Sequence, residues 1–232
     1  MNPFNASLIF LGLVCSGFFV GQGLEKFNRN ERSISVRGLA EKEVVSNVAI
    51  WKIYFSVSSD KMEQVRVELP AVQKSIQDFL ASKGFNPDEV SKTSSIKDRQ
   101  AQEYGAEKGN RYVASGIYQI TSEQVEKVSR AREDLDELVK KGVVIGRDQI
   151  DYHFTNLNQI KPEMLDQATV NAKEAAQGFA KSMDVKVGKL KSATQGVFSI
   201  ESPIGGENEY GSNQSSLMKK VRVVTQVEFY ID

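Results

Sequence analysis

The first 24 residues of this 232-residue chain carry no charged side chain, whereas the chain from Glu25 onward is rich in charge. The apolar run over residues 6–20 can reach across most of a bilayer as a helix, because a span needs roughly 17–25 mainly apolar residues. The rest of the chain is therefore either tethered to a membrane or carried through one. The sequence predicts an anchor or signal segment over residues 1–25, a linker over 26–32 and one domain over 33–232.

Three interpretations of this leader compete. A cleavable secretory signal fits Gly21, Gln22 and Gly23 as a cleavage site, but residues 1–5 contain no Lys or Arg. A lipoprotein signal would use Cys15, but the bulkier Val14 precedes it and the apolar run continues beyond it. An uncleaved anchor requires no basic start, and the apolar run is long enough for one. We therefore expect a single membrane helix.

The composition excludes several classes of protein. Lys and Arg together number 30, and so do Asp and Glu, so the chain has no overall positive field with which to hold nucleic acid. The same balance excludes a strongly acidic, disordered chain. Cys15 is the only cysteine, so the part after the leader has no disulfide and no thiol. This usage suits an oxidising compartment without proving one.

The remaining sequence alternates between strand and helix patterns. Period-two alternation predicts strands over residues 33–38, 44–58, 90–96, 111–121, 150–157, 190–200 and 221–231. Helical spacing predicts one helix over 62–80, which Pro70 should kink or divide, and another over 125–139 that ends at Gly142. This mixed order favours an α+β fold with antiparallel strands, packed with two to three helices.

A third helix should open at Pro162, which is favoured in a first helical turn. Its expected buried stripe has unusually small side chains and should pack closely against another element: Leu165, Ala168, Ala172, Ala175, Phe179 and Met183. Two polar segments lack any period. Residues 98–110 resemble an exposed hairpin loop, and residues 202–216 are either a mobile loop or a contact surface.

No group of residues predicts a catalytic, metal or cofactor site. His153 is the only histidine, beside Asp151 and Thr155 on a strand, and a structural or surface role is favoured because no second histidine is present for a metal. A Ser-His-Asp triad would require His153, yet no Gly-x-Ser-x-Gly elbow accompanies it. The acidic run 133–137 is typical of a solvated helix face balanced by nearby Arg and Lys.

Neither the paired glycines nor the basic residues of the late strands predict a binding site. Gly205 and Gly206 lack the following Lys and Ser or Thr of a phosphate-binding loop. Five basic residues on the late strands do not outweigh the balanced charge, so nucleic-acid binding is not expected: Lys189, Lys191, Lys219, Lys220 and Arg222.

Several segments together resemble the SIMPL-domain family. Residues 34–41, Ile-Ser-Val-Arg-Gly-Leu-Ala-Glu, are similar to its opening V-x-G-x-G/A-E, and a long strand follows. Later, a helix ends at Gly142 before the strand 150–154. The alanine-rich stretch 168–180 then matches the recurrent A-x-x-x-A-x-x-K/A-A-x-x-L/F-A, and Gly188 lies where the family has a short turn. The resemblance covers about residues 33–232.

The resemblance implies an α+β domain, usually exported to the bacterial periplasm or held at the envelope. Some relatives assemble into ring-like or channel-like oligomers, and some are linked to tolerance of oxidative stress. Most have no defined activity, so the family supplies no catalytic residues. Bacterial relatives often have a signal peptide with a basic start, from which this leader departs.

The two indications of orientation disagree. Lys26, Arg29 and Arg32 follow the leader, and the positive-inside tendency would keep them in the cytoplasm. The resemblance favours the periplasm. We follow the resemblance because a few flanking charges bias topology without fixing it. The expected location is a single-pass protein of the bacterial inner membrane with a periplasmic domain, and a cytoplasmic domain stays open.

Three hypotheses of function follow. The first is a non-enzymatic envelope protein, anchored by residues 6–20, whose domain forms a homo-oligomer or scaffolds an unidentified protein partner through strand edges and the two loops. The second is a monomeric, tethered module that binds a ligand or a protein in a groove. The third, least favoured, is a hydrolase that depends on His153.

Overall fold

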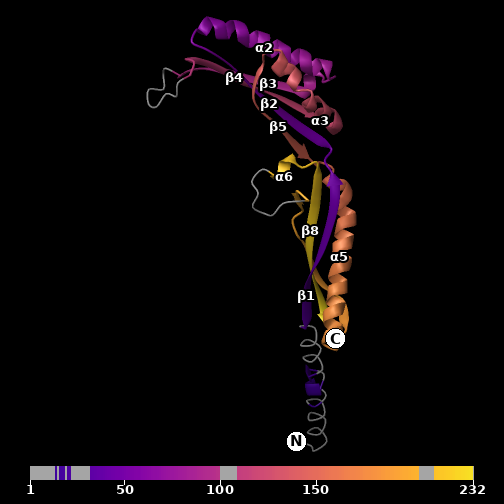
Figure 1. Ribbon diagram of the computed structural model, residues 1–232. Helices are drawn as coiled ribbons and strands as arrows, with labels where there is room; N and C mark the ends of the chain where they lie inside the picture. The colour runs from indigo at the N-terminus through magenta and orange to yellow at the C-terminus, as the bar shows by residue number, and fades with distance from the viewer. Residues whose placement is uncertain are drawn as a thin grey trace, which may run out of the picture. The chain divides into compact units, whose positions relative to one another are not determined.

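The computed structural model describes residues 14, 16–18, 20–21, 32–99, 109–203 and 212–231. The chain forms two compact units. Unit 1 comprises Met1–Lys42, Asn158–Ser199 and Val221–Asp232, and unit 2 comprises Glu43–Leu157 and Ile200–Lys220. Each unit has an antiparallel sheet and a long helix (Figure 1), so the predicted α+β class with antiparallel strands is confirmed.

Unit 2 has a four-stranded sheet in the order β3-β4-β2-β5. Its strands are β2 (Val48–Ser59), β3 (Val90–Asp98), β4 (Tyr112–Ser122) and β5 (Val144–His153). The central strand β2 pairs antiparallel with β4 on one side and β5 on the other, so Trp51 lies between Ile120 and Ile150. β3 and β5 are the edges.

The core of unit 2 lies on one face of this sheet. Alternate residues of β2 are buried there, as their spacing predicts: Ala49, Trp51, Ile53, Phe55 and Val57. Helices α2 (Met62–Ser82) and α3 (Val125–Glu133) contact β2, and Ile76, Phe79 and Val128 join the same apolar cluster. The intervening side chains of β2 therefore point to the opposite face.

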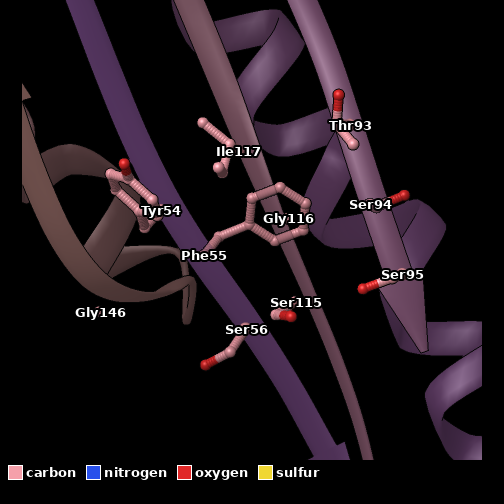
Figure 2. Close-up of a pocket in the computed structure, with 10 residues that line it drawn as sticks. All are labelled: Tyr54, Phe55, Ser56, Thr93, Ser94, Ser95, Ser115, Gly116, Ile117 and Gly146. Atoms are coloured by element: carbon pink, nitrogen blue, oxygen red, sulfur yellow. The ribbon is translucent and has the colours of Figure 1, made fainter. Parts of the chain in front are cut away.

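One cross-strand pair in this core requires a glycine. Phe55 pairs with Gly116, and its ring lies over the glycine (Figure 2). A Cβ atom on Gly116 would lie 2.5 Å from Phe55 Cζ and 2.7 Å from the carbonyl oxygen of Thr93. The missing side chain thus makes room for the aromatic ring, which also packs against Tyr118 at 5.6 Å between ring centroids.

The helices of unit 2 differ from the expected pattern. α2 runs continuously through Pro70, so the predicted division into two helices is wrong, whereas the alternative of a kink stays a prediction. Pro70 is exposed, and water can therefore satisfy the carbonyl that loses its donor.

The helix expected over 125–139 is instead two helices, α3 and α4 (Asp136–Lys140). Leu135 N–H donates to the Arg132 carbonyl at 3.1 Å, a tighter turn that interrupts the helix.

The count of helices also exceeds the expected two to three. The described residues hold α2 to α5, a four-residue α6 (Ser212–Ser215) and a 3-10 turn η1 (Pro87–Glu89). Gly142 has φ of +82° and follows α4, as predicted for the end of that helix.

Unit 1 contains the sheet β1-β8-β6, with β7 (Ser199–Glu201) also paired to β8. Its strands are β1 (Ser33–Val45), β6 (Val187–Gln195) and β8 (Met218–Ile231). β1 continues through the break predicted at 38–43, and the interruption falls at Ser46 and Asn47. There Ser46 N–H donates to the Leu217 carbonyl and Asn47 N–H to the His153 carbonyl. These partners are distant in sequence, so the alternation could not place the break.

The long helix of unit 1, α5 (Leu157–Ser182), begins before Pro162, so the prediction that this proline opens the helix is wrong. Its buried residues recur at every fourth position: Met164, Ala168, Ala172, Ala176 and Ala180. Phe179 and Met183, expected in the stripe, are instead 57% and 55% exposed. Rows of residues four apart are inclined to a helix axis by about 26°, and the twisted sheet follows this row rather than the axial stripe.

The alanine row allows the helix and the sheet to approach at backbone distance. A Cβ atom on Gly38 of β1 would lie 1.8 Å from the Ala168 carbonyl oxygen and 2.6 Å from the Ala172 nitrogen. Asn171 Nδ2 adds a hydrogen bond of 2.7 Å to the Leu39 carbonyl. The expectation that another element packs closely against this small-residue helix is therefore confirmed.

Several predicted features lie wholly or largely outside the described residues. They are the membrane helix over 6–20 with Cys15, the linker over 26–31, and most of the loops 98–110 and 202–216. Residues 14, 16–18, 20 and 21 are helical. In the described part of the chain, no helix has both the length and the apolar character needed to span a membrane.

The contact at Gly38 generates a test of stability. We expect Gly38→Ala to lower the free energy of unfolding by about 3 kcal/mol, because its methyl group would force apart two packed backbones. Gly178→Ala is the matched control, since a Cβ atom there meets nothing within 4 Å. As an alanine inside a helix, it should stabilise by about 0.5–1 kcal/mol. Urea unfolding measures both variants, and equal effects would contradict the close approach.

Tyr118 generates a test at alkaline pH. Its buried hydroxyl donates to the Gln73 carbonyl at 3.1 Å, and burial raises the pKa of Tyr118 to about 12. Folding therefore favours the protonated phenol, and its contribution is full below the ordinary pKa of about 10 and is lost as pH rises toward 12. Above pH of about 10 the wild type should lose up to about 1.4 kcal/mol per pH unit more than Tyr118→Phe. Urea unfolding measures both proteins across this pH range. An equal loss of unfolding free energy in the wild type and in Tyr118→Phe would contradict the assigned role of the hydroxyl.

Candidate functional site

The face of the unit 2 sheet opposite α2 is the candidate functional surface. We call it the open face and define it by the outward residues of the four strands: Ile50, Lys52, Tyr54, Ser56, Ser91, Thr93, Ser95, Ser115, Ile117, Gln119, Thr121, Val144, Arg147, Gln149 and Asp151. They alternate with the buried residues, so they share one face. All but Asp151 are half-buried or exposed. The open face is therefore mostly polar, and its large apolar side chains are Ile50, Tyr54, Ile117 and Val144.

Hydroxyl groups from three strands gather around a shallow pocket on the open face (Figure 2). Ser56, Thr93, Ser95 and Ser115 contribute to its lining, and its volume is about 360 Å³. Its lining residues include no carboxylate, amine, imidazole or thiol. Such a surface can hydrogen-bond to a polar ligand or to another protein, but it supplies no strong acid, base or nucleophile.

A buried ionic cluster lies further along the same face. Lys52 Nζ donates to Asp151 Oδ2 at 3.0 Å, and Gln149 Nε2 donates to Asp151 Oδ1 at 2.7 Å. The Asp151 side chain is 4% exposed and that of Lys52 31%. Lys219, at the start of β8, is also buried, and its Nζ donates to the Gln214 carbonyl of α6 at 3.4 Å.

The charges in this cluster are mutually supporting. Burial acts to raise the pKa of Asp151, but hydrogen bonds from Gln149 and Lys52, with the charges of Lys52 and His153, hold that pKa below its ordinary value. Burial lowers the pKa of Lys219, and the negative charge of Asp151 opposes that shift. The cluster thus keeps a carboxylate ionised inside the protein, which is the arrangement of a structural ion pair.

His153 lies at the end of β5, on the same face as Asp151, and is half-buried. Its backbone carbonyl accepts the Asn47 N–H at 3.0 Å, where β1 gives way to β2. Among the described residues, its imidazole forms no hydrogen bond to a serine hydroxyl. The structure therefore brings His153 and Asp151 together on one face, but it does not complete a triad from them.

The acidic run 133–137 obtains partners from other elements. Lys83, which follows α2, donates to Asp134 at 2.6 Å and to Glu137 at 2.9 Å. These hydrogen bonds raise the pKa of Lys83. Arg132 pairs with Asp148 of β5. The predicted balance with Arg and Lys on the same helix is thus replaced largely by contacts between elements.

Sequence reasoning missed the buried cluster. In the sequence Lys219 is one of five basic residues on the late strands, although it continues the alternation of Val221, Val223 and Thr225. This alternation could have predicted the burial of Lys219, since every second residue of β8 from Lys219 to Phe229 is buried. In the part of the chain that the structure describes, no group of three or more His, Cys, Asp or Glu could hold a metal ion.

The cluster generates a test of stability. Asp151→Asn should lower the free energy of unfolding near neutral pH by about 2 kcal/mol, less than for a fully buried pair because Lys52 is partly exposed. Since the folded pKa of Asp151 lies below its unfolded value, the difference from wild type should shrink as pH falls through and below about 3.9.

The matched control is Asp148→Asn, which removes the more exposed pair with Arg132. We expect it to cost under about 1 kcal/mol. Urea unfolding across pH measures both variants. Equal losses for both, or an Asp151→Asn loss that persists in acid, would contradict the assigned role of the cluster.

Comparison with known proteins gives one match. A model of the SIMPL family, described as a protein of unknown function (DUF541), matches residues 34–229. No curated protein matches the chain. The family match includes the Gly38 contact, the alanine row of α5 and the whole open face. Since it covers well over half of the sequence, the chain belongs to the SIMPL family.

Proposed function

We propose that this protein is a non-enzymatic, membrane-anchored component of the bacterial envelope whose SIMPL domain self-assembles. The observation that carries the proposal is the open face of unit 2. It is a broad polar sheet surface with four hydroxyl-bearing residues beside Tyr54 and Ile117. Its one buried carboxylate, Asp151, is engaged by Lys52 and Gln149. This chemistry suits recognition by hydrogen bonds and shape.

The sheet edges support assembly as well. β3 and β5 border the sheet of unit 2, and β3 is exposed along most of its length. An edge strand presents backbone N–H and C=O groups that can pair with another chain. A second copy of this chain, or a scaffolded partner, would find both hydroxyl groups and strand edges on the same unit.

The uncharged leader supports the anchor. Held in a membrane by residues 6–20, each domain would meet others at a raised effective concentration, so weak contacts would suffice for assembly. Family resemblance supports the inner membrane and a periplasmic domain, and it is also the basis for proposing a role in stress tolerance. The lack of cysteine after the leader suits that compartment.

A second candidate is a monomeric, tethered module that binds a small polar ligand. The pocket of about 360 Å³ on the open face favours it, because its volume lies within the range of small-molecule sites. Its hydroxyl-rich lining would suit a ligand with many hydrogen-bonding groups. The two candidates differ in the mass of the native protein.

The test is the mass of the full-length protein in mild detergent, measured by light scattering after size exclusion. We expect a defined oligomer. Ile117→Lys places a charge at the centre of the open face, and it should weaken assembly by roughly 100-fold because like charges brought together in an interface cost several kcal/mol. The control is Val67→Lys, at an exposed apolar position of α2.

A monomeric wild type across the concentration range would overturn self-assembly and favour the ligand-binding candidate. Equal loss of mass in both variants would show that the open face is not the contact surface. Retention of the oligomer by Ile117→Lys would do the same.

A further inference from the structure

Unit 1 carries a concentration of positive charge that the balanced composition conceals. Residues 181–191, which we call the lysine-rich turn, contain Lys181, Lys186, Lys189 and Lys191 but one acidic residue, Asp184. Three large apolar side chains in or next to this turn are exposed, namely Phe179, Met183 and Leu190, each by more than half. Lysines interleaved with exposed apolar groups are typical of surfaces that bind the membrane interface.

The fold places these features at one end of unit 1. α5 ends at Ser182, and Val185 N–H closes the helix end by donating to the Ala180 carbonyl at 3.0 Å. Val187, the first residue of β6, pairs with Ile231. Figure 1 shows the C-terminus beside the end of α5. Leu190 pairs with Phe229, which packs in the cluster containing Ala172, so Leu190 lies on the α5 side of the sheet.

The leader joins unit 1 at this same end. Ile231 N–H donates to the Arg32 carbonyl at 3.1 Å, immediately before β1 begins. Seven residues lie between Leu24, the last of the uncharged segment, and Arg32, and these eight residue steps can extend over at most about 28 Å. If the leader is the anchor of the proposed function, on which this inference rests, the lysine-rich turn must stay within that reach of the membrane.

We propose that the lysine-rich turn docks on anionic lipid headgroups of the membrane that holds the leader, with Phe179, Met183 and Leu190 entering the interfacial layer. Lys191 is engaged by Glu228 at 3.0 Å, so Lys181, Lys186 and Lys189 carry the headgroup contact. All three are exposed. Charge complementarity favours an anionic surface, and the apolar side chains require one with a hydrocarbon layer beneath it.

The test places a fluorescent, environment-sensitive label at Leu190→Cys in the full-length chain, with Cys15→Ala as background. The protein is reconstituted into phosphatidylcholine vesicles with or without phosphatidylglycerol, using lipids brominated on their acyl chains as quenchers. The control label is at Val197→Cys in the same unit, where Val197 is 90% exposed. Its neighbour Gly196 bonds to Val224, seven residues along β8 from Ile231, which is roughly 23 Å away.

In vesicles that contain phosphatidylglycerol, we expect bromolipids to reduce emission from the Leu190→Cys label by roughly twofold and to leave the Val197→Cys label unchanged. Lys186→Glu with Lys189→Glu should abolish the quenching, and unchanged urea unfolding would show that this variant is folded. Without phosphatidylglycerol the quenching should be several-fold weaker.

Vesicle flotation separates the outcomes. A protein that floats with vesicles but whose Leu190→Cys label is not quenched would overturn the docking and leave the anchor standing. Equal quenching with and without phosphatidylglycerol, or in the Lys186→Glu and Lys189→Glu variant, would overturn the headgroup contact. A blue-shifted label that bromolipids do not quench would show that protein covers the surface and would also overturn the proposal. A protein that fails to float would overturn the anchor and the docking together.

Discussion

The backbone contact between Gly38 and the alanine row of α5 is the constraint on which unit 1 depends. With a hypothetical Cβ only 1.8 Å from the Ala168 carbonyl, no side chain fits at this position. Because the helix lies this close, its contact line must follow small residues spaced by four, and the larger Phe179 and Met183 are turned outward. The exposed apolar surface beside the lysine-rich turn is therefore a consequence of how the helix packs.

Unit 2 is packed with large side chains rather than small ones. Its sheet buries large aromatic side chains on one face, and Gly116 makes room for the ring of Phe55. With the core confined to that face, the opposite face is left mostly to polar side chains, among them the Lys52–Asp151 pair. A buried carboxylate with two donors is inert as an acid or base near neutral pH, since both its charge and its position are fixed.

Part of the candidate site could be read from the sequence. The alternation in β2 separates Lys52, Tyr54 and Ser56 from the buried set, so the composition of one strand of the open face follows from its spacing. The strands that pair with it cannot be identified from this spacing. Asp151 reaches Lys52 only because β5 pairs with β2 in one register, and Lys219 joins them from a distant part of the chain. A pattern within one segment carries no information on such pairing.

The sequence alone determined the α+β class, the family and most of the strands and helices, because alternation and helical spacing are local properties. It also determined that residues 168–180 must pack closely, since small side chains leave a helix free to approach its neighbour. Only the tertiary structure decided that α2 runs through Pro70, that α5 begins before Pro162, and that β1 ends at Val45. The end of β1 depends on hydrogen bonds from Ser46 and Asn47 to residues remote in sequence, which no local pattern contains. At Pro70 the exposure of the helix to water decides, and that exposure depends on how α2 packs.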